Sequence, residues 1–236
     1  MRRRTLMVVG VLLVALVLGA VWWRARRASQ RARLQDEHTG TTLLHQASAN
    51  GIVGAVKLRL GWGERADLKD AFGMTPLGYA AREGHTRVAE LLLSAGARVD
   101  QRGERGWTAL HVAAGMGRTA VAELLLGRGA AVDLPDECGM TPLHHAAAEG
   151  HTETARLLVS SGAQVAARDK LGWTPLHYAA YEGRVQAARL LLDRGAEASA
   201  RNQAGLTPLD EARPRGHAEM VALLSRGKEG VPHAGR

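Results

Sequence analysis

A threonine recurs every 33 residues through most of this chain, and this period constrains the fold more than any other feature of the sequence. Each threonine opens a similar string, such as TPLGYAAREG or TPLHHAAAEG, and a second apolar run follows each string. The six threonines are Thr42, Thr75, Thr108, Thr141, Thr174 and Thr207. A fixed period of this length predicts a stack of small units that bury one continuous core between them.

Each unit is expected to form two short helices and a loop. The threonine can cap the first helix with its hydroxyl, and the proline after it suits the first turn, where no N–H donor is needed. Leucine and paired alanines point inward, and a glycine such as Gly150 permits the left-handed conformation that ends a helix. The second helix carries a run of leucines and ends at a glycine such as Gly162. The remaining residues are rich in turn formers and predict a β-hairpin-like finger.

The period and the string T-P-L-H-x-A-A resemble the ankyrin repeat family, over about residues 41–226. The resemblance implies an all-α fold: an ankyrin-repeat solenoid with a helix-turn-helix and a β-hairpin finger in each 33-residue repeat. The six repeats together span residues 41–230, and a tail covers 231–236. Their approximate bounds are 41–73, 74–106, 107–139, 140–172, 173–205 and 206–230.

The first and last units depart from the pattern. The first lacks the proline and reads LRLGWGERADL where a later unit reads LLLSAGARVDQ. The last has Asp210 at the histidine position and Pro214 in the turn that ends its first helix. Such departures suit end units that must face water.

The string TPLHHAAAEGH places three histidines close together, which raises the question of metal binding. The repeat gives the answer, because His144 has counterparts in other units and so has His151. The counterparts are His45, His111 and His177 for the first, and His85 and His217 for the second. The resemblance implies that the motif histidine ties a repeat to its neighbour through hydrogen bonds to backbone and threonine. We therefore predict structural histidines and no bound metal.

The sequence contains no motif typical of an enzyme. H-E-x-x-H, G-x-S-x-G and G-x-x-x-x-G-K-[ST] are all missing, and Cys138 is the only cysteine. His144 follows Cys138 by six residues, but a free thiol is a simpler interpretation than a catalytic nucleophile. We predict a protein without enzymatic activity or cofactor.

The excess of basic residues is entirely N-terminal. The formal charge is +8, and residues 1–33 hold eight arginines and no acidic residue. The remaining 23 Lys and Arg equal the 23 Asp and Glu. A neutral body creates no field that attracts phosphates, so we predict no nucleic-acid partner.

An apolar segment of 19 uncharged residues, Thr5–Trp23, precedes the repeats. As a helix it would be about 28 Å long, close to the thickness of a bilayer's hydrocarbon core. We predict a basic tail over 1–4, an uncleaved transmembrane signal-anchor over 5–23 and a basic juxtamembrane linker over 24–40. Its flanks combine interfacial tryptophans with cations: Trp22, Trp23, Arg24, Arg26 and Arg27.

A cleaved signal peptide is the alternative, since MRRR makes a charged start. The apolar run is longer than usual for a signal peptide, however, and no small-x-small cleavage site precedes the tryptophans. Five arginines follow the segment and three precede it, which favours, by a small margin, a cytoplasmic repeat domain. We therefore predict a single-pass membrane protein whose linker arginines hold the stack close to anionic headgroups.

Ankyrin repeat domains bind proteins through variable positions on a concave face of finger tips and first helices, and the resemblance implies such a face here. One large side chain precedes most of the motif threonines, and interfaces are enriched in such residues. These side chains could instead pack finger against finger. The candidate protein-binding residues are Phe72, Met74, Trp107, Met116, Met140, Trp173 and Tyr181.

Together these features favour a membrane-anchored scaffold or adaptor that binds a protein partner on the concave face. One alternative is a self-associating structural component of the envelope, for which the small-residue pair Ala15 and Gly19 could bring two anchors together. Another is a secreted repeat protein released by signal cleavage.

Overall fold

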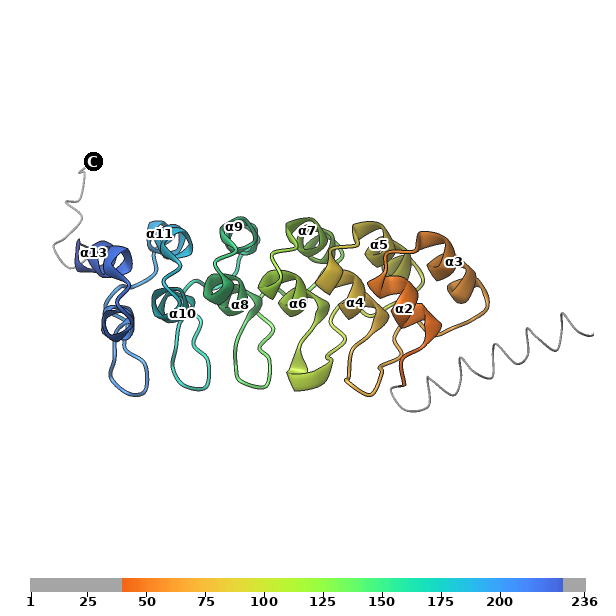
Figure 1. Cartoon of the computed structure of the whole chain (residues 1–236), viewed down its shortest axis with the longest axis horizontal. Helices are drawn as coiled ribbons and strands as arrows, with labels where there is room; N and C mark the ends of the chain where they lie inside the picture. Colours follow the sequence, from red (N-terminus) through yellow and green to blue (C-terminus); the bar gives the residue numbers. More distant parts are fainter. Residues whose placement is uncertain (1–39, 227–236) are drawn as a thin grey trace, which may run out of the picture. The chain divides into compact units, whose positions relative to one another are not determined.

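The helices form two rows, and each repeat contributes one helix to each row (Figure 1). The computed structural model describes residues 40–226, and all the helices below belong to the compact unit Leu43–Arg236. The first row contains α2 (Leu43–Ala49), α4 (Pro76–Glu83), α6 (Ala109–Gly115), α8 (Pro142–Glu149), α10 (Pro175–Tyr181) and α12 (Pro208–Ala212). The second contains α3 (Val53–Gly61), α5 (Thr86–Ser94), α7 (Thr119–Gly127), α9 (Thr152–Ser160), α11 (Val185–Asp193) and α13 (Ala218–Arg226). Successive helices pack together along each row, which confirms the predicted helical repeat stack.

Threonine, proline and glycine define the ends of the first-row helices, as α8 shows. Nδ1 of His144 accepts a hydrogen bond from the N–H of Thr141 at 3.0 Å, and the threonine hydroxyl caps the same turn. Pro142 takes the first helical position, where no N–H partner is needed. Gly150 ends the helix at φ 80°, a left-handed conformation that favours glycine because it has no Cβ.

Leucines at the 33-residue period form the core of the stack. Each has at most 2% of its surface exposed, and burial of a leucine contributes about 1.5–3 kcal/mol to stability. Alanines such as Ala146 and Ala179 lie between them and let neighbouring helices approach closely. The first-row leucines are Leu44, Leu77, Leu110, Leu143, Leu176 and Leu209, and those of the second row are Leu92, Leu125, Leu158, Leu191 and Leu224.

From α5 onward, the residue before each second-row helix bonds back to the preceding repeat. His85, His151 and His217 use Nε2 to reach a carbonyl oxygen 36 residues earlier, at 3.0–3.1 Å. Arg118 and Arg184 make the same connection with Nε at 3.0 Å. This position of the repeat therefore faces the N-terminal neighbour, whichever of the two residue types occupies it.

The fingers turn back on themselves as hairpins but contain no strand anywhere in residues 40–226, which corrects the predicted β-hairpin. A buried carboxylate closes the finger: Oδ1 of Asp136 accepts the N–H groups of Cys138 at 2.8 Å and Met140 at 2.9 Å. Between neighbouring fingers the backbone bond is single, as from Lys170 N–H to the Cys138 carbonyl at 2.9 Å. A strand pair needs a series of such bonds, so these fingers remain loops.

The finger before α6 differs from the others. Gly103 stands where the neighbouring fingers have Asp70 and Asp136, so no side chain can accept the N–H groups of this finger. Residues Glu104–Gly106 form a short 3-10 turn, η1, instead. Arg105 in this turn has φ 55° and is the one non-glycine residue with positive φ in the described part of the chain.

Within residues 40–226, no helix combines the length and the apolar character that a membrane span requires. The predicted anchor over 5–23, with its flanks Trp22, Trp23, Arg24, Arg26 and Arg27, lies outside the described residues. The same holds for the tail over 1–4, the linker up to residue 39 and the tail over 231–236.

Candidate protein-binding face

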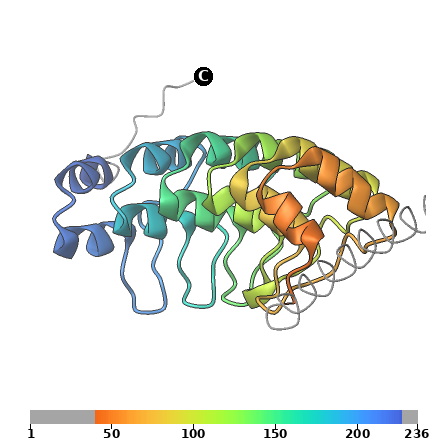
Figure 2. The ribbon, with the colours of Figure 1, turned by 45° about the vertical axis from the view of Figure 1, so that its right-hand side comes forward.

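The finger loops and the exposed side of the first-row helices form one side of the stack, which we call the finger face. In Figure 2 the fingers extend from the first-row helices, and the second-row helices lie along the opposite edge. All seven predicted binding residues lie in the fingers, in first-row helices or directly after them. Two of them are exposed in the structure, and five are partly buried.

Phe72 and Met116 are the two exposed residues. Phe72 lies at a finger tip with 56% of its surface exposed, and Met116, directly after α6, is 45% exposed. The residues that other repeats carry at the Met116 position are all polar, and four of the five are charged: Asn50, Glu83, Glu149, Glu182 and Arg215. The stack therefore does not need an apolar group at this position.

Trp107 is partly buried and belongs to a polar cluster. Its Nε1 donates a hydrogen bond to Oδ2 of Asp136 at 3.1 Å, and Nε2 of His145 lies 3.0 Å from the same oxygen. The rings of Trp107 and His145 meet edge to face with 4.8 Å between their centroids. The scaffold therefore uses the polar group of this tryptophan, while part of its ring remains accessible.

Trp173 and Tyr181 form an aromatic cluster with Tyr178. The centroid of Trp173 lies 4.9 Å from that of Tyr178 and 5.2 Å from that of Tyr181. The hydroxyl of Tyr178 donates to Oδ2 of Asp169 at 2.7 Å, and the Arg215 guanidinium stacks on the Tyr181 ring. Partly exposed, well-packed aromatic and arginine side chains are the types that most often dominate binding energy.

Met74 and Met140 are partly buried at the bases of their fingers. The Cε atom of Met74 covers Gly78, because a Cβ added to this glycine would lie 3.1 Å from it. The end of the Met74 side chain therefore packs within the scaffold, which explains why this residue is partly buried. A direct role of either methionine in binding stays a prediction.

The motif histidines are structural. Nε2 of His144 bonds to the Trp173 carbonyl at 3.1 Å, so both ring nitrogens are engaged. Loss of solvent lowers the pKa of His111 and of His144 to about 4, and it lowers the pKa of His177 as well. No group of three His, Cys, Asp or Glu side chains within residues 40–226 is arranged to bind a metal ion.

Asp136 is a charged group in a buried position. Burial by itself raises the pKa of this carboxyl, but hydrogen bonds from His145 and from the N–H groups of Met140 and Cys138 outweigh it and lower the pKa to about 2. The carboxylate therefore remains ionised at neutral pH and holds the finger and the Trp107 ring in place.

One contact that recurs in several repeats was not predicted from the sequence. The finger carboxylate bonds to a side chain nine residues later, as in Asp70 with Tyr79 and Asp169 with Tyr178, both at 2.7 Å. His145 takes the same place opposite Asp136. The available signal was the shared spacing in the strings DAFGMTPLGY, DECGMTPLHH and DKLGWTPLHY. His145 thus has a fixed role, although its position varies between repeats.

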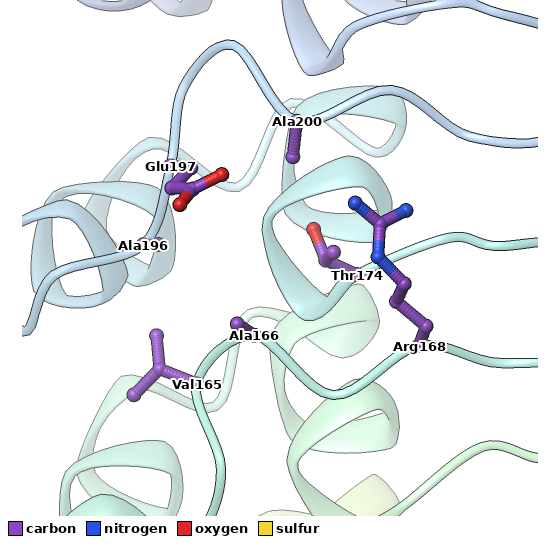
Figure 3. A pocket seen from close by; sticks show the side chains of 7 residues that line it. All are labelled: Val165, Ala166, Arg168, Thr174, Ala196, Glu197 and Ala200. Carbon is purple, nitrogen blue, oxygen red and sulfur yellow. The ribbon is translucent and has the colours of Figure 1, made fainter.

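A cavity of about 250 Å³ lies between the fourth and fifth repeats, at the base of their loops (Figure 3). At earlier junctions an aspartate accepts an N–H 31 residues on, as Asp133 does from Gln164 at 3.1 Å. Ala166 occupies this position here, opposite Glu197, and cannot form the bond. The other lining residues are Val165, Arg168, Thr174, Ala196 and Ala200.

The cavity does not resemble a catalytic site. Arg168 donates from Nη1 to the carbonyls of Gly172 and Arg201, and the Thr174 hydroxyl is engaged with His177. Both polar groups are therefore occupied by bonds within the scaffold, as is the His177 ring, which also bonds to the Leu206 carbonyl. The absence of enzymatic activity stays a prediction for the whole chain.

A family model described as ankyrin repeats (3 copies) matches residues 15–103, 44–136, 95–169, 120–202 and 165–231. These overlapping matches extend over most of the chain, which therefore belongs to the ankyrin repeat family. A comparison with curated proteins finds no match. Ankyrin repeats imply a module for protein–protein interaction, and the finger face carries exposed apolar groups such as Phe72 and Met116.

Proposed function

We propose that this protein is a membrane-tethered scaffold or adaptor that binds a protein partner on its finger face. The observation that carries the proposal is the exposure of Met116 at a position where the other repeats have polar, mostly charged side chains. Phe72 and the clusters around Trp107 and Trp173 extend the apolar surface along the same face.

The packing of these clusters supports binding energetically. The rings of Trp107 and Trp173 are held by His145 and Tyr178, so little conformational freedom remains to be lost when a partner covers them. Met116 and Phe72 can be covered without disturbing any core contact. Truncating a true hot-spot residue costs on the order of 2 kcal/mol of binding energy or more.

The tether is the uncharged segment 5–23, with the repeats on the cytoplasmic side. Its support is the length of the segment and the arginines that flank it. A topology reporter fused after Arg236 tests the orientation, and we expect a signal from a cytoplasmic reporter. A signal from a reporter that works only outside the cytoplasm would reverse the assignment.

Site-specific photocrosslinking tests the binding face. A photoreactive amino acid replaces Met116 in the full chain, in membranes of cells that express it. The matched control replaces Glu123, which is exposed on α7 of the same repeat and belongs to the second row. We expect a crosslink to a distinct protein at position 116 and none at position 123.

Two other results would redirect the proposal. Equal crosslinking at both positions would show that the finger face is not the binding surface. A product containing two copies of this chain would favour the self-associating structural component. N-terminal sequencing of the mature chain decides the secreted alternative, since a start at Met1 or Arg2 excludes signal cleavage.

A further inference from the structure

The first repeat leaves an apolar surface uncovered at the N-terminal end of the stack. In Figure 2, α3 is the first helix of its row, and no described helix packs on its outer side. Three large apolar side chains along this helix are exposed: Ile52 at 53%, Leu58 at 51% and Trp62 at 68%. We call these three residues the end patch.

The other repeats show how two of these positions are used elsewhere in the stack. At the position of Ile52, the other repeats have the histidine or arginine that bonds to the preceding repeat, such as His85 to the Ala49 carbonyl. At the position of Leu58, residues such as Leu91 and Leu124 are partly buried against the core. The Ile52 position therefore faces an N-terminal neighbour, which the first repeat does not have among the described residues, and Leu58 is exposed where its counterparts are partly buried.

Trp62 is not required by the stack. It follows Leu58 by four residues and so lies on the same side of the helix end. The corresponding residues of the other repeats are small or polar: Ala95, Arg128, Ser161 and Arg194. Packing in the core therefore does not explain why this exposed position carries a tryptophan.

The exposed charges in and next to α3 are basic, and the acidic residue beside them, Glu64, is paired with Arg59. The segment from Leu43 to Gly63 contains no Asp or Glu, whereas each of the five later helix pairs has at least one. Lys57 is exposed within this segment, and Arg65 is exposed just beyond it. Arg59 pairs with Glu64 at 2.6 Å, with its guanidinium 5.5 Å from the centre of the Trp62 ring.

We propose that the end patch lies against a bilayer surface that contains anionic lipids. The inference rests on the proposed membrane tether, because the chain between the apolar segment and Leu43 is only residues 24–42. A tryptophan favours the membrane interface, leucine and isoleucine enter its apolar edge, and lysine and arginine attract anionic headgroups. Gly54 and Gly61 on α3 have no neighbouring atoms within 4 Å of an added Cβ, so the helix surface is open at both positions.

Lipid-dependent quenching of a fluorophore tests this contact in the full chain, with Cys138→Ser as background. A cysteine at position 61 (Gly61→Cys) carries an environment-sensitive dye beside the end patch. Gly127→Cys is the matched control, because Gly127 occupies the same position of a later repeat and is equally open. Both proteins are reconstituted into vesicles of phosphatidylcholine with or without phosphatidylglycerol, and quenching by spin-labelled lipid is measured.

We expect spin-labelled lipid to quench the dye at position 61 several-fold more strongly than the dye at position 127. The difference should shrink without phosphatidylglycerol and disappear in a Leu58→Gln, Trp62→Gln double variant. Flotation of the chain with the vesicles is measured in parallel and reports on the tether alone.

Three results would overturn the inference. Equal quenching at both positions in a chain that floats would remove the end patch from the membrane while the tether stands. A chain that does not float would lack the tether, and the lipid contact would fall with it. Energy transfer between two chains labelled at position 61, without lipid quenching, would show that a second copy of the chain covers the patch.

Discussion

At the scale of single residues, the buried histidines determine how the stability of the stack depends on pH. The pKa of His111 and of His144 is about 4 in the folded chain, below the ordinary value of 6.5. Between these two values the unfolded chain binds more protons than the folded one, so stability falls as pH decreases through this window. Asp136 does not change stability in this window, because the stabilisation that accompanies its lowered pKa of about 2 is lost only as pH falls below the ordinary value of 3.8.

We therefore expect the free energy of unfolding to be highest above pH 6.5 and to fall steadily towards pH 4. The shifts correspond to roughly 2–3 kcal/mol for each of the two buried histidines at the lower end. Urea unfolding at a series of pH values measures this, and His144→Asn should remove one histidine's share of the slope. An unfolding free energy that stays constant between pH 7 and pH 4.5 would contradict the assignment of neutral histidines.

Arg105 offers a second test at the residue scale. Its φ of 55° is unfavourable for a side chain with a Cβ atom, and no hydrogen bond of the described chain uses its guanidinium. We expect Arg105→Gly to stabilise the fold by about 0.5–1 kcal/mol, the difference between the relieved strain and the added freedom of the unfolded chain. Thermal unfolding measures this change in stability. Arg128→Gly is the control: Arg128 has a negative φ of −99° at the end of α7, so glycine should not stabilise the fold there.

At the scale of the repeat elements, the loop aspartates connect neighbouring units. Asp100 and Asp133 accept the N–H groups of Ala131 and Gln164, and Ala166 interrupts this series. We expect Ala166→Asp to restore the bond to the N–H of Glu197 and to stabilise the stack by about 0.5–1.5 kcal/mol.

The reverse substitution provides the control for this junction. Asp133→Ala should destabilise the stack by a similar amount, because it removes the bond to Gln164. Both variants can be compared by urea unfolding at pH 7. If Ala166→Asp destabilises while Asp133→Ala is neutral, the loop aspartates do not connect the repeats in the way described.

The sequence predicts the elements of this fold better than the contacts between them. The helix pairs follow from the threonine caps and the leucine period, and the structural role of His144 follows from its recurrence. The missing strands and the Trp107–Asp136–His145 cluster were not predictable in the same way, because they depend on contacts between residues of different repeats. The exposure of Leu58, whose counterparts Leu91 and Leu124 are partly buried, likewise depends on contacts beyond its own repeat.

At the scale of the whole molecule, each repeat contacts only its neighbours, and this leaves two kinds of surface. The finger face runs along the stack and presents one set of side chains per repeat, which suits an extended contact with a protein. The end patch occurs once, at the first repeat, and in our account it faces lipid. A scaffold tethered in this way would hold its partner next to the membrane.

The central claim is that the exposed side chains of the finger face provide the binding energy for a protein partner. The most direct measurement is the affinity of the partner identified at position 116 for Met116→Ala and, as a control, for Glu123→Ala. We predict that Met116→Ala weakens binding by about 30-fold, equivalent to roughly 2 kcal/mol, while Glu123→Ala leaves the affinity unchanged. Equal affinities for both variants and the unaltered chain would contradict the claim.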